Sequence, residues 1–85
     1  MYKVSLSTKS FKFLKRSDPK LREALQRKIN MLAQNPFDAA LNVKKLKGRE
    51  GYRLRVGDYR ILYTVENNIV TIHIVDIAHR REVYQ

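Results

Sequence analysis

Cysteine and tryptophan are absent from this 85-residue chain, and it contains only three glycines and two prolines. Without cysteine it can form no disulfide and offers no thiolate for catalysis or zinc binding. Secreted domains of this size usually depend on disulfides, so we expect a reducing compartment, the cytoplasm. No apolar run approaches the roughly 20 residues that span a bilayer. The stretch Met1–Leu6 also lacks the apolar core of a signal peptide.

Acidic residues are scarce as well. Eight Asp and Glu stand against eighteen Lys and Arg, which gives a formal net charge of +10. Such a charge attracts polyanions, nucleic acid first and an acidic protein second. The hydrophobic share of 44% is ordinary for a folded chain. We therefore expect a single small globular domain over residues 1–85 with an anionic partner.

Two helices are predicted in the first half of the chain. Thr8 is the expected N-cap of a short helix over Lys9–Arg16. Asp18 and Pro19 then form a strong helix start, and the second helix runs to about Gln34. Its buried face is predicted by four apolar residues at helical spacing: Leu21, Leu25, Ile29 and Leu32. The short link between the helices predicts a helical hairpin.

The remaining pattern has the period of two that is typical of strands. Residues 36–51 look like a loop, and Gly57-Asp58 and Asn67-Asn68 are expected two-residue turns. The predicted strands are Tyr2–Leu6, Tyr52–Val56, Tyr59–Val65 and Ile69–Ile77. Together these elements predict an α+β fold in the order strand, helix, helix, three strands. We expect a mostly antiparallel four-stranded sheet with the helical hairpin packed on one face.

Counting residues outward from the two turns divides the sheet into two faces. One face is apolar and predicts the core: Tyr52, Leu54, Ile61, Tyr63, Val65, Val70, Ile72 and Ile74. The other carries Arg53, Arg55, Arg60 and His73, with no acid among them. Arg55 and Arg60 are expected directly opposite each other, and like charges in that position destabilise a sheet. This arrangement favours a binding site for phosphate over a merely solvated basic strand.

The two histidines are the groups suited to proton transfer near neutral pH. His79 ends the last strand beside Arg80 and Arg81, and we take it as the candidate for proton transfer, whereas His73 is interpreted as a sheet-surface residue. His73, Asp76 and His79 have a spacing typical of metal ligands, but regular alternation puts residues 73 and 76 on opposite faces. We therefore predict no metal site. Tyr84 could anchor the tail, stack on a base or donate a proton.

Three segments together resemble a known family. They are Lys45–Gly48 (KLKG), Tyr52–Tyr63 (YRLRVGDYRILY) and His79–Tyr84 (HRREVY). With the order of elements they resemble the RelE branch of the RelE/ParE toxin superfamily over essentially the whole chain. The resemblance implies the toxin of a toxin–antitoxin pair that cleaves mRNA in the ribosomal A site, without metal or cofactor. Cleavage would follow attack by the ribose 2′-OH on the adjacent phosphorus.

The resemblance also implies roles for residues. The implied catalytic residues are Arg60, His79, Arg80 and Tyr84, and the implied RNA-binding residues are Lys45, Lys47, Arg53, Arg55 and Arg81. The best-known RelE-type pattern has lysines at the positions of Arg53 and Arg55. Because arginine does not give up its proton, these two can bind and polarise but cannot act as a base, which leaves that role to His79 with Tyr84 in reserve.

The expected partners are mRNA and rRNA at the ribosome and an acidic antitoxin segment that folds on binding. Two other functions remain open at this point. A ParE-like toxin would share the fold and inhibit DNA gyrase without nuclease activity. A plain RNA-binding module would bind RNA and not cleave it.

Overall fold

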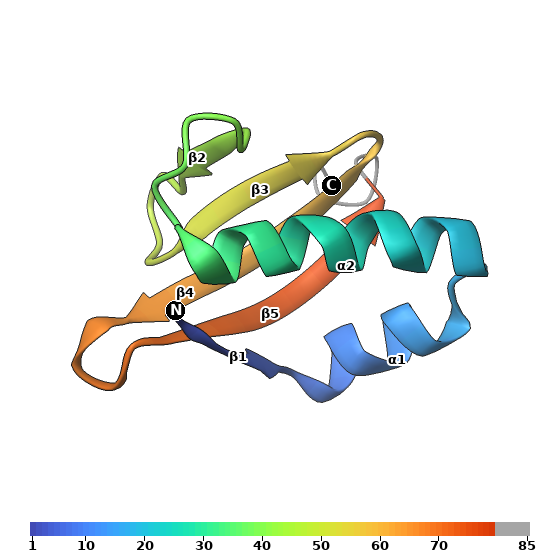
Figure 1. Cartoon of the computed structure of the whole chain (residues 1–85), viewed down its shortest axis with the longest axis horizontal. Helices are drawn as coiled ribbons and strands as arrows, with labels where there is room; N and C mark the ends of the chain where they lie inside the picture. The colour runs from blue at the N-terminus through green and yellow to red at the C-terminus, as the bar shows by residue number, and fades with distance from the viewer. Residues whose placement is uncertain (80–85) are drawn as a thin grey trace.

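The computed structural model describes residues 1–79, so Arg80, Arg81 and Tyr84, each predicted to serve the site, lie outside the described residues. The elements follow the predicted order of strand, two helices and further strands (Figure 1). They are β1 (Lys3–Leu6), α1 (Thr8–Arg16), α2 (Pro19–Gln34), β2 (Val43–Lys45), β3 (Tyr52–Val56), β4 (Tyr59–Glu66), a 3-10 turn (Asn67–Ile69) and β5 (Thr71–His79). Within the described residues no helix is long and apolar enough to cross a membrane.

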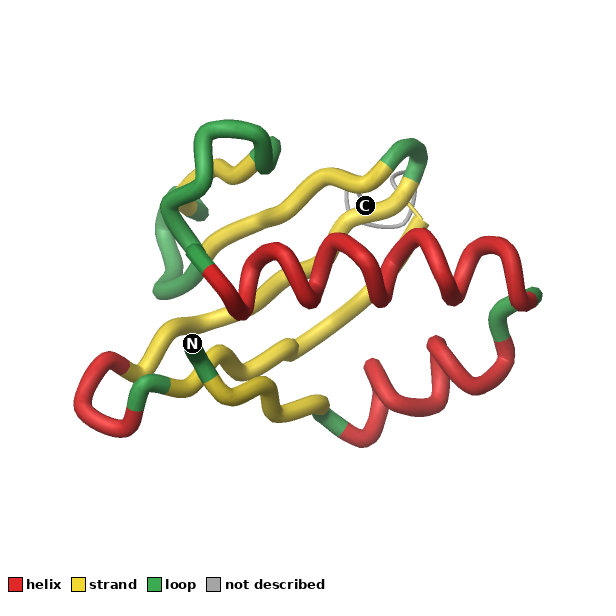
Figure 2. The backbone as a smooth tube through the Cα atoms, viewed as in Figure 1, coloured by secondary structure: helices red, strands yellow, loops and turns green. Residues whose placement is uncertain are grey.

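The strands form one sheet in the order β1-β5-β4-β3-β2. Only β1 and β5 are parallel, so the predicted mostly antiparallel sheet is confirmed. The sheet has five strands and not four, because β2 forms where the sequence predicts a loop (Figure 2). β2 has only three residues, of which Val43 packs against the core, and such a short segment carries no readable alternation.

The caps explain where the helices begin. Asp18 accepts a hydrogen bond from the backbone N–H of Leu21 at 3.0 Å, and α2 starts at Pro19 as predicted. The cap of α1 is Ser7, whose Oγ accepts from the N–H of Ser10 at 3.1 Å. The expected cap, Thr8, is instead the first helical residue. Ser7 and Thr8 are both good caps, and the extended backbone of Ser7 decides between them.

The core lies between α2 and the sheet. Of the predicted helix face, Leu25, Ile29 and Leu32 are buried, and α2 runs in front of the strands (Figure 1). α1 continues from β1 alongside β5 and contributes Leu14 to the same core. The segment between α2 and β2 contributes Leu41. The sheet contributes the other buried residues of this cluster: Leu54, Ile61, Tyr63, Ile72, Ile74 and Ile77.

One predicted core residue, Val70, is 44% exposed. The connection between β4 and β5 is not a two-residue turn at Asn67-Asn68. It is a 3-10 turn that ends at Val70, which adopts a left-handed backbone with φ of 48°. The longer connection shifts the pairing, so that Tyr63 pairs with Ile74 and not with Ile72. A shift of two residues keeps the same side chains on the same face, which is why the rest of the predicted core survives.

The hairpin between β3 and β4 has the predicted register. Leu54 pairs with Ile61 and Arg55 with Arg60. Gly57 has a φ of 57°, as the first position of a II′ turn requires.

A β-bulge interrupts β5. Tyr63 pairs with Ile74, but the preceding residue of β4, Leu62, pairs with Asp76, so that Val75 is left over. The extra residue reverses the alternation of β5 from this point on. Ile77 therefore faces the core, where it is 2% exposed.

Candidate functional site: the arginine face and the β5 groove

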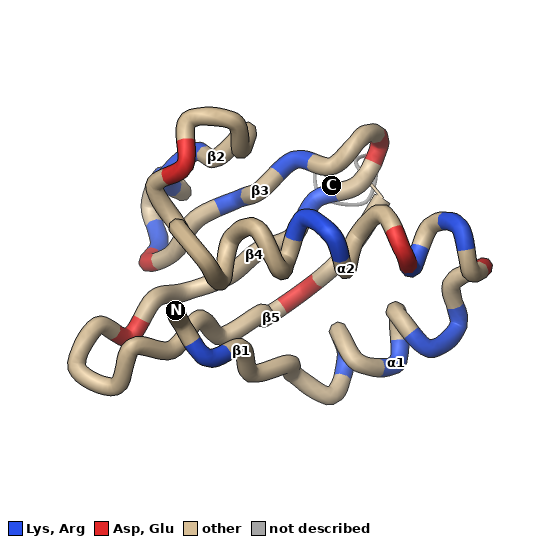
Figure 3. The backbone as a smooth tube through the Cα atoms, viewed as in Figure 1, with Lys and Arg blue, Asp and Glu red and all other residues tan. Residues whose placement is uncertain are grey.

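Three arginines share the sheet face that lies away from the core. Arg53 and Arg55 come from β3 and Arg60 from β4, and the ladder pairs Arg55 with Arg60. We call these three residues the arginine face. Figure 3 shows the basic positions along β3. The predicted gathering of arginines on one face is therefore confirmed, because adjacent strands in register present opposed residues to the same side.

These arginines are not simply solvated. Arg60 is 2% exposed, and Arg53 and Arg55 are half-buried. The Nε atoms of Arg53 and Arg55 are buried and have no hydrogen-bond partner among the described residues. Leaving a buried charged donor unsatisfied costs free energy. An oxyanion that accepts hydrogen bonds from these arginines would remove that cost, and two oxygens of a phosphate match the planar fork of a guanidinium.

The predicted basic residues around the arginine face are only partly brought together with it. Lys44 of β2 pairs with Arg53 and belongs to the same side. Nothing in the sequence pattern distinguishes it from the neighbouring lysines. Lys45 pairs with Tyr52, so it is on the core side of the sheet and is not brought together with the arginine face. Lys47 lies in the exposed loop between β2 and β3.

An acidic residue stands beside the arginine face, where the sequence predicts none. The bulge turns Asp76 to this side, opposite Leu62. Its Oδ2 accepts from Lys9 Nζ at 3.3 Å, and its Oδ1 is buried without a hydrogen-bond partner in the part of the chain described. The expectation that residues 73 and 76 face opposite sides is wrong for the same reason. The sequence does contain a signal for the bulge. The buried isoleucines of β5 are Ile72, Ile74 and Ile77, and their spacing changes from two residues to three where the bulge lies.

His79 is on the opposite side of the sheet from the arginines. It pairs with Tyr59, and the two rings meet edge to face with centroids 5.2 Å apart. Phe13 of α1 makes a similar contact with Tyr59 at 5.9 Å. Regular alternation would place residue 79 on the arginine side, and the bulge reverses this. The candidate proton-transfer residue His79 and Arg60 therefore lie on opposite faces of the sheet.

A groove of about 790 Å³ nevertheless connects the two sides. It runs round the edge of β5 where β1 no longer covers it, since β1 pairs only as far as Ile74. We call it the β5 groove. It is lined by Lys9, Lys12, Phe13, Arg16, Ser17, Leu21, Arg49, Tyr59, Leu62, Asp76, Ile77, Ala78 and His79. Leu62, Asp76 and Ala78 come from the arginine side, so a ligand in the groove can contact that side and His79 together.

His73 lies away from this groove. It pairs with Thr64, and its Nε2 is 2.8 Å from Glu66 Oε1. This placement agrees with its interpretation as a sheet-surface residue. Among residues 1–79 no group of three His, Asp or Glu side chains comes together as metal ligands would.

Comparison with known proteins identifies the family. Residues 6–84 match the model of the ParE toxin of the type II toxin–antitoxin system parDE. The chain belongs to the RelE/ParE superfamily of type II toxins. No curated protein is significantly similar to it in sequence.

Solved structures of RelE proteins share the fold of this superfamily member. The archaeal RelE–RelB complex from Pyrococcus horikoshii OT3 has a TM-score of 0.79 at 26% identity, over 93% of this chain and 94% of that one. The RelB–RelE complex from Methanococcus jannaschii has a TM-score of 0.76 at 28% identity, over 95% of each chain. The isolated E. coli RelE toxin has a TM-score of 0.78 at 24% identity, over 99% of this chain and 92% of that one. The α+β fold predicted from the sequence is thus a RelE-like fold.

Proposed function

We propose that this toxin cleaves mRNA at the ribosome. The observation that carries the proposal is the arginine face, where Arg55 and Arg60 are opposed in the ladder and Arg53 stands beside them. A gyrase inhibitor has no need for three clustered arginines on a sheet, whereas cleavage of a phosphodiester needs them to stabilise a doubly charged phosphorane. The resemblance of residues 52–63 and 79–84 to RelE supports the same choice.

The reaction is an internal transfer of the phosphoryl group. The ribose 2′-oxygen forms a bond to phosphorus, the bond from phosphorus to the 5′-oxygen breaks, and a 2′,3′-cyclic phosphate and a 5′-OH remain. One proton leaves the 2′-OH and another is delivered to the 5′-oxygen. Arg55 and Arg60 would bind the phosphate and stabilise its added charge, which is a role that a permanently protonated side chain can fill. Arg53 would hold a neighbouring phosphate.

His79 is the proposed proton-transfer group. Arg60 pairs with Ala78, the residue before His79, so the histidine follows directly on the strand position that borders the proposed phosphate site. Ala78 and His79 both line the β5 groove, so RNA in the groove would reach the histidine at the strand edge beside Arg60's partner residue. By the family resemblance, Arg80 would assist phosphate binding and Tyr84 would position a nucleotide. Arg81 and Lys47 would add to RNA affinity.

The proposed regulator is an antitoxin with an acidic segment. The RelE proteins of P. horikoshii and M. jannaschii were both solved in complex with RelB. In this chain the net charge of +10 would attract an acidic segment over long range. The 39% exposed Val75 would offer it an apolar contact, whereas Leu62, at 9% exposed, has little surface to offer. Association should therefore slow as salt is raised from about 50 to 500 mM, because ions screen charges beyond about 10 Å.

Cleavage mapping on ribosomes tests the function. Purified toxin is incubated with programmed ribosomes, and new 5′ ends are located on the mRNA. Arg60→Lys keeps the charge in a buried position but loses the planar fork, and we expect it to lower the single-turnover cleavage rate at least about tenfold. Lys45→Ala, on the other side of the sheet, is the matched control and should cleave at the normal rate.

The alternative has its own measurement. The family model that matches residues 6–84 is named for ParE, which favours a gyrase inhibitor as the second candidate. DNA supercoiling by purified gyrase is measured with and without the toxin. Intact mRNA together with inhibited gyrase would overturn the proposed nuclease. A toxin that binds RNA but neither cleaves mRNA nor inhibits gyrase would be a plain RNA-binding module.

The role of His79 is tested separately. His79→Ala should slow the chemical step under single-turnover conditions and leave ribosome binding nearly unchanged. Ribosome binding is measured alongside the rate, because a group that acts only in proton transfer affects the chemical step and not the affinity. An unchanged single-turnover rate in His79→Ala would transfer the role to Tyr84 or to a ribosomal group.

A further inference from the structure

The β5 groove has the composition of a site for an unpaired nucleotide. Its apolar lining comes from Phe13, Leu21 and Ile77, and two further rings, Tyr59 and His79, stand in edge-to-face contact beside them. Its rim is cationic: Lys9, Lys12, Arg16 and Arg49. Apolar and aromatic surface within a cationic rim is the combination by which proteins hold single-stranded RNA. The volume of about 790 Å³ is ample for one nucleotide.

One acidic side chain stands within this cationic groove. Asp76 forms one ion pair, through Oδ2 to Lys9 Nζ at 3.3 Å. A carboxylate can accept about four hydrogen bonds, and its Oδ1 accepts none from the described residues. A carboxylate repels phosphate, so simple affinity for the RNA backbone would select against an acid here. Oδ1 is also buried, and leaving a buried carboxylate oxygen without a hydrogen-bond partner costs free energy. A ligand that offers N–H donors would remove this cost, which points to such a ligand.

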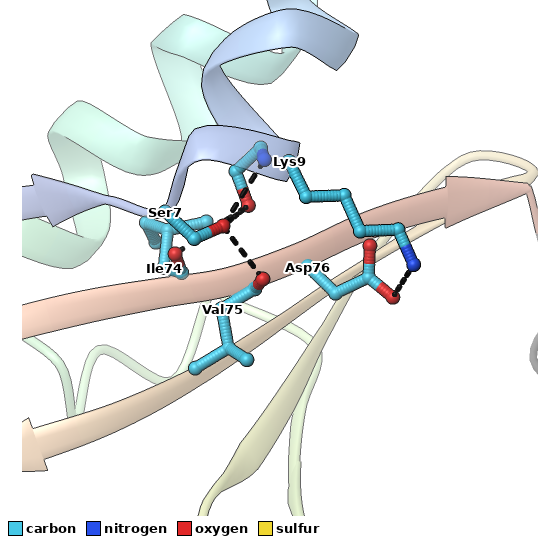
Figure 4. Close-up of polar contacts among 6 residues, drawn as sticks. Ser7, Lys9, Ile74, Val75 and Asp76 are labelled. Atoms are coloured by element: carbon cyan, nitrogen blue, oxygen red, sulfur yellow. Dashed lines mark hydrogen bonds and ion pairs between the residues drawn. The ribbon is translucent and has the colours of Figure 1, made fainter.

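The position of Asp76 is built into the fold. The Ser7 Oγ donates to the carbonyl of Val75, the bulged residue, at 2.7 Å (Figure 4). The Ser10 Oγ donates to the carbonyl of Ile74 at 3.4 Å. The two hydroxyls are 2.9 Å apart. The start of α1 thus holds the bulge that turns Asp76 out of the core and into the groove. Lys9 of α1, two residues after the cap Ser7, then orients the Asp76 carboxylate through their ion pair.

We propose that the β5 groove binds an unpaired guanine of the substrate RNA, and that the Asp76 carboxylate recognises its Watson–Crick edge. Guanine is the one RNA base that presents two adjacent N–H donors on that edge, and the two oxygens of a carboxylate can accept both. The inference rests on the proposed RNA-cleaving function and adds base selectivity to it. Asp76 acts here as a specificity residue and takes no part in the bond changes.

Binding of uncleavable RNA tests the inference. The probes are short, fluorescently labelled oligoadenylates with 2′-O-methyl groups throughout and one central position that is G, A, C or U. We expect the wild-type toxin to bind the guanine probe about tenfold more tightly than the other three, the discrimination typical of a two-point contact. Asp76→Asn should reduce this preference to below about twofold, with similar affinity for the adenine probe. Asp76→Glu, which keeps the charge, should retain part of it.

Lys9→Met is the matched control, because it removes the ion pair and keeps the alkyl chain. It should weaken binding of all four probes and preserve the preference for guanine. Equal loss of preference in Lys9→Met and Asp76→Asn would mean that Asp76 only anchors α1, and would overturn the inference. Thermal unfolding of each variant checks that it is folded.

Two further outcomes would also overturn it. One is a wild-type toxin that binds all four probes equally. The other is a β5 groove that binds a protein partner. In an NMR titration, an acidic antitoxin peptide would then shift the amide resonances of Asp76 and Ile77, and the RNA probes would leave them unchanged. Because the probes cannot be cleaved, the binding experiment does not depend on nuclease activity. A toxin that binds the guanine probe selectively but does not cleave mRNA on ribosomes would count against the proposed nuclease function alone. Cleavage on ribosomes without selective binding would count against this inference alone.

Discussion

The two faces of the sheet are made by alternate residues of the same strands, yet they differ in every physical respect. On the covered face Leu54, Ile61 and Ile72 are 0% exposed. Complete burial of such a side chain contributes about 1.5–3 kcal/mol. On the other face Arg55 opposes Arg60, which costs from a few tenths to about 1 kcal/mol. The covered face therefore offsets the cost of a face whose charges repel one another, and this allows a small domain to keep the arginines that we propose bind phosphate.

The largest expected effect comes from breaking the covered face. Leu54→Ala should lower the free energy of unfolding by about 3 kcal/mol, since it leaves a cavity under α2. Its neighbour on the other face, Arg53→Ala, should change the free energy by less than about 1 kcal/mol. Urea unfolding of both variants measures the difference. Similar losses for the two would mean that both faces support the fold equally.

A smaller effect concerns Tyr63, which is the buried tyrosine among residues 1–79 and belongs to the covered face. Burial, with a lesser contribution from the nearby Tyr52, raises the pKa of Tyr63 to about 12 from its usual value of 10.0. The unfolded chain releases this proton near pH 10 while the folded chain retains it, so the free energy of unfolding should fall as the pH rises from 10 to about 12. Tyr63→Phe should lack this part of the decline, which amounts to about 2–3 kcal/mol for two pKa units.

The measurement is denaturant unfolding of wild type and Tyr63→Phe below pH 10 and near pH 12. The difference between the two proteins should change with pH in favour of the variant. Parallel curves would show that the Tyr63 hydroxyl ionises as it does in water.

The smallest effect concerns RNA affinity and distinguishes two adjacent lysines of β2 that lie on opposite faces of the sheet. Lys44 is on the arginine side and Lys45 on the covered side. Lys44→Ala should weaken binding of single-stranded RNA a few-fold and reduce the slope of log affinity against log salt by about 0.7, the loss of one phosphate contact. Lys45→Ala should leave the slope unchanged. A larger effect at Lys45 would restore the role predicted for it from the sequence.

Much of the fold could be predicted because its signals are local. Asp18 and Pro19 mark the start of α2, and Gly57 marks a turn whose geometry sets the register of β3 and β4. That register alone places Arg55 opposite Arg60. The short β2 strand was missed because three residues contain too little pattern, and its pairing with β3 depends on a contact between distant parts of the chain.

The bulge in β5 separates what the sequence by itself determined from what the tertiary structure decided. Residue types and turn signals determined the order of elements, the core face of β3 and β4 and the arginine face. They did not determine which side of the sheet Asp76 and His79 occupy. That depends on the bulge at Val75 of β5. The bulge is held by hydroxyl groups from a distant part of the chain, those of Ser7 and Ser10. A single inserted residue reverses every side chain beyond it. The β5 groove, which joins α1 to the end of β5, accordingly exists only in the folded chain.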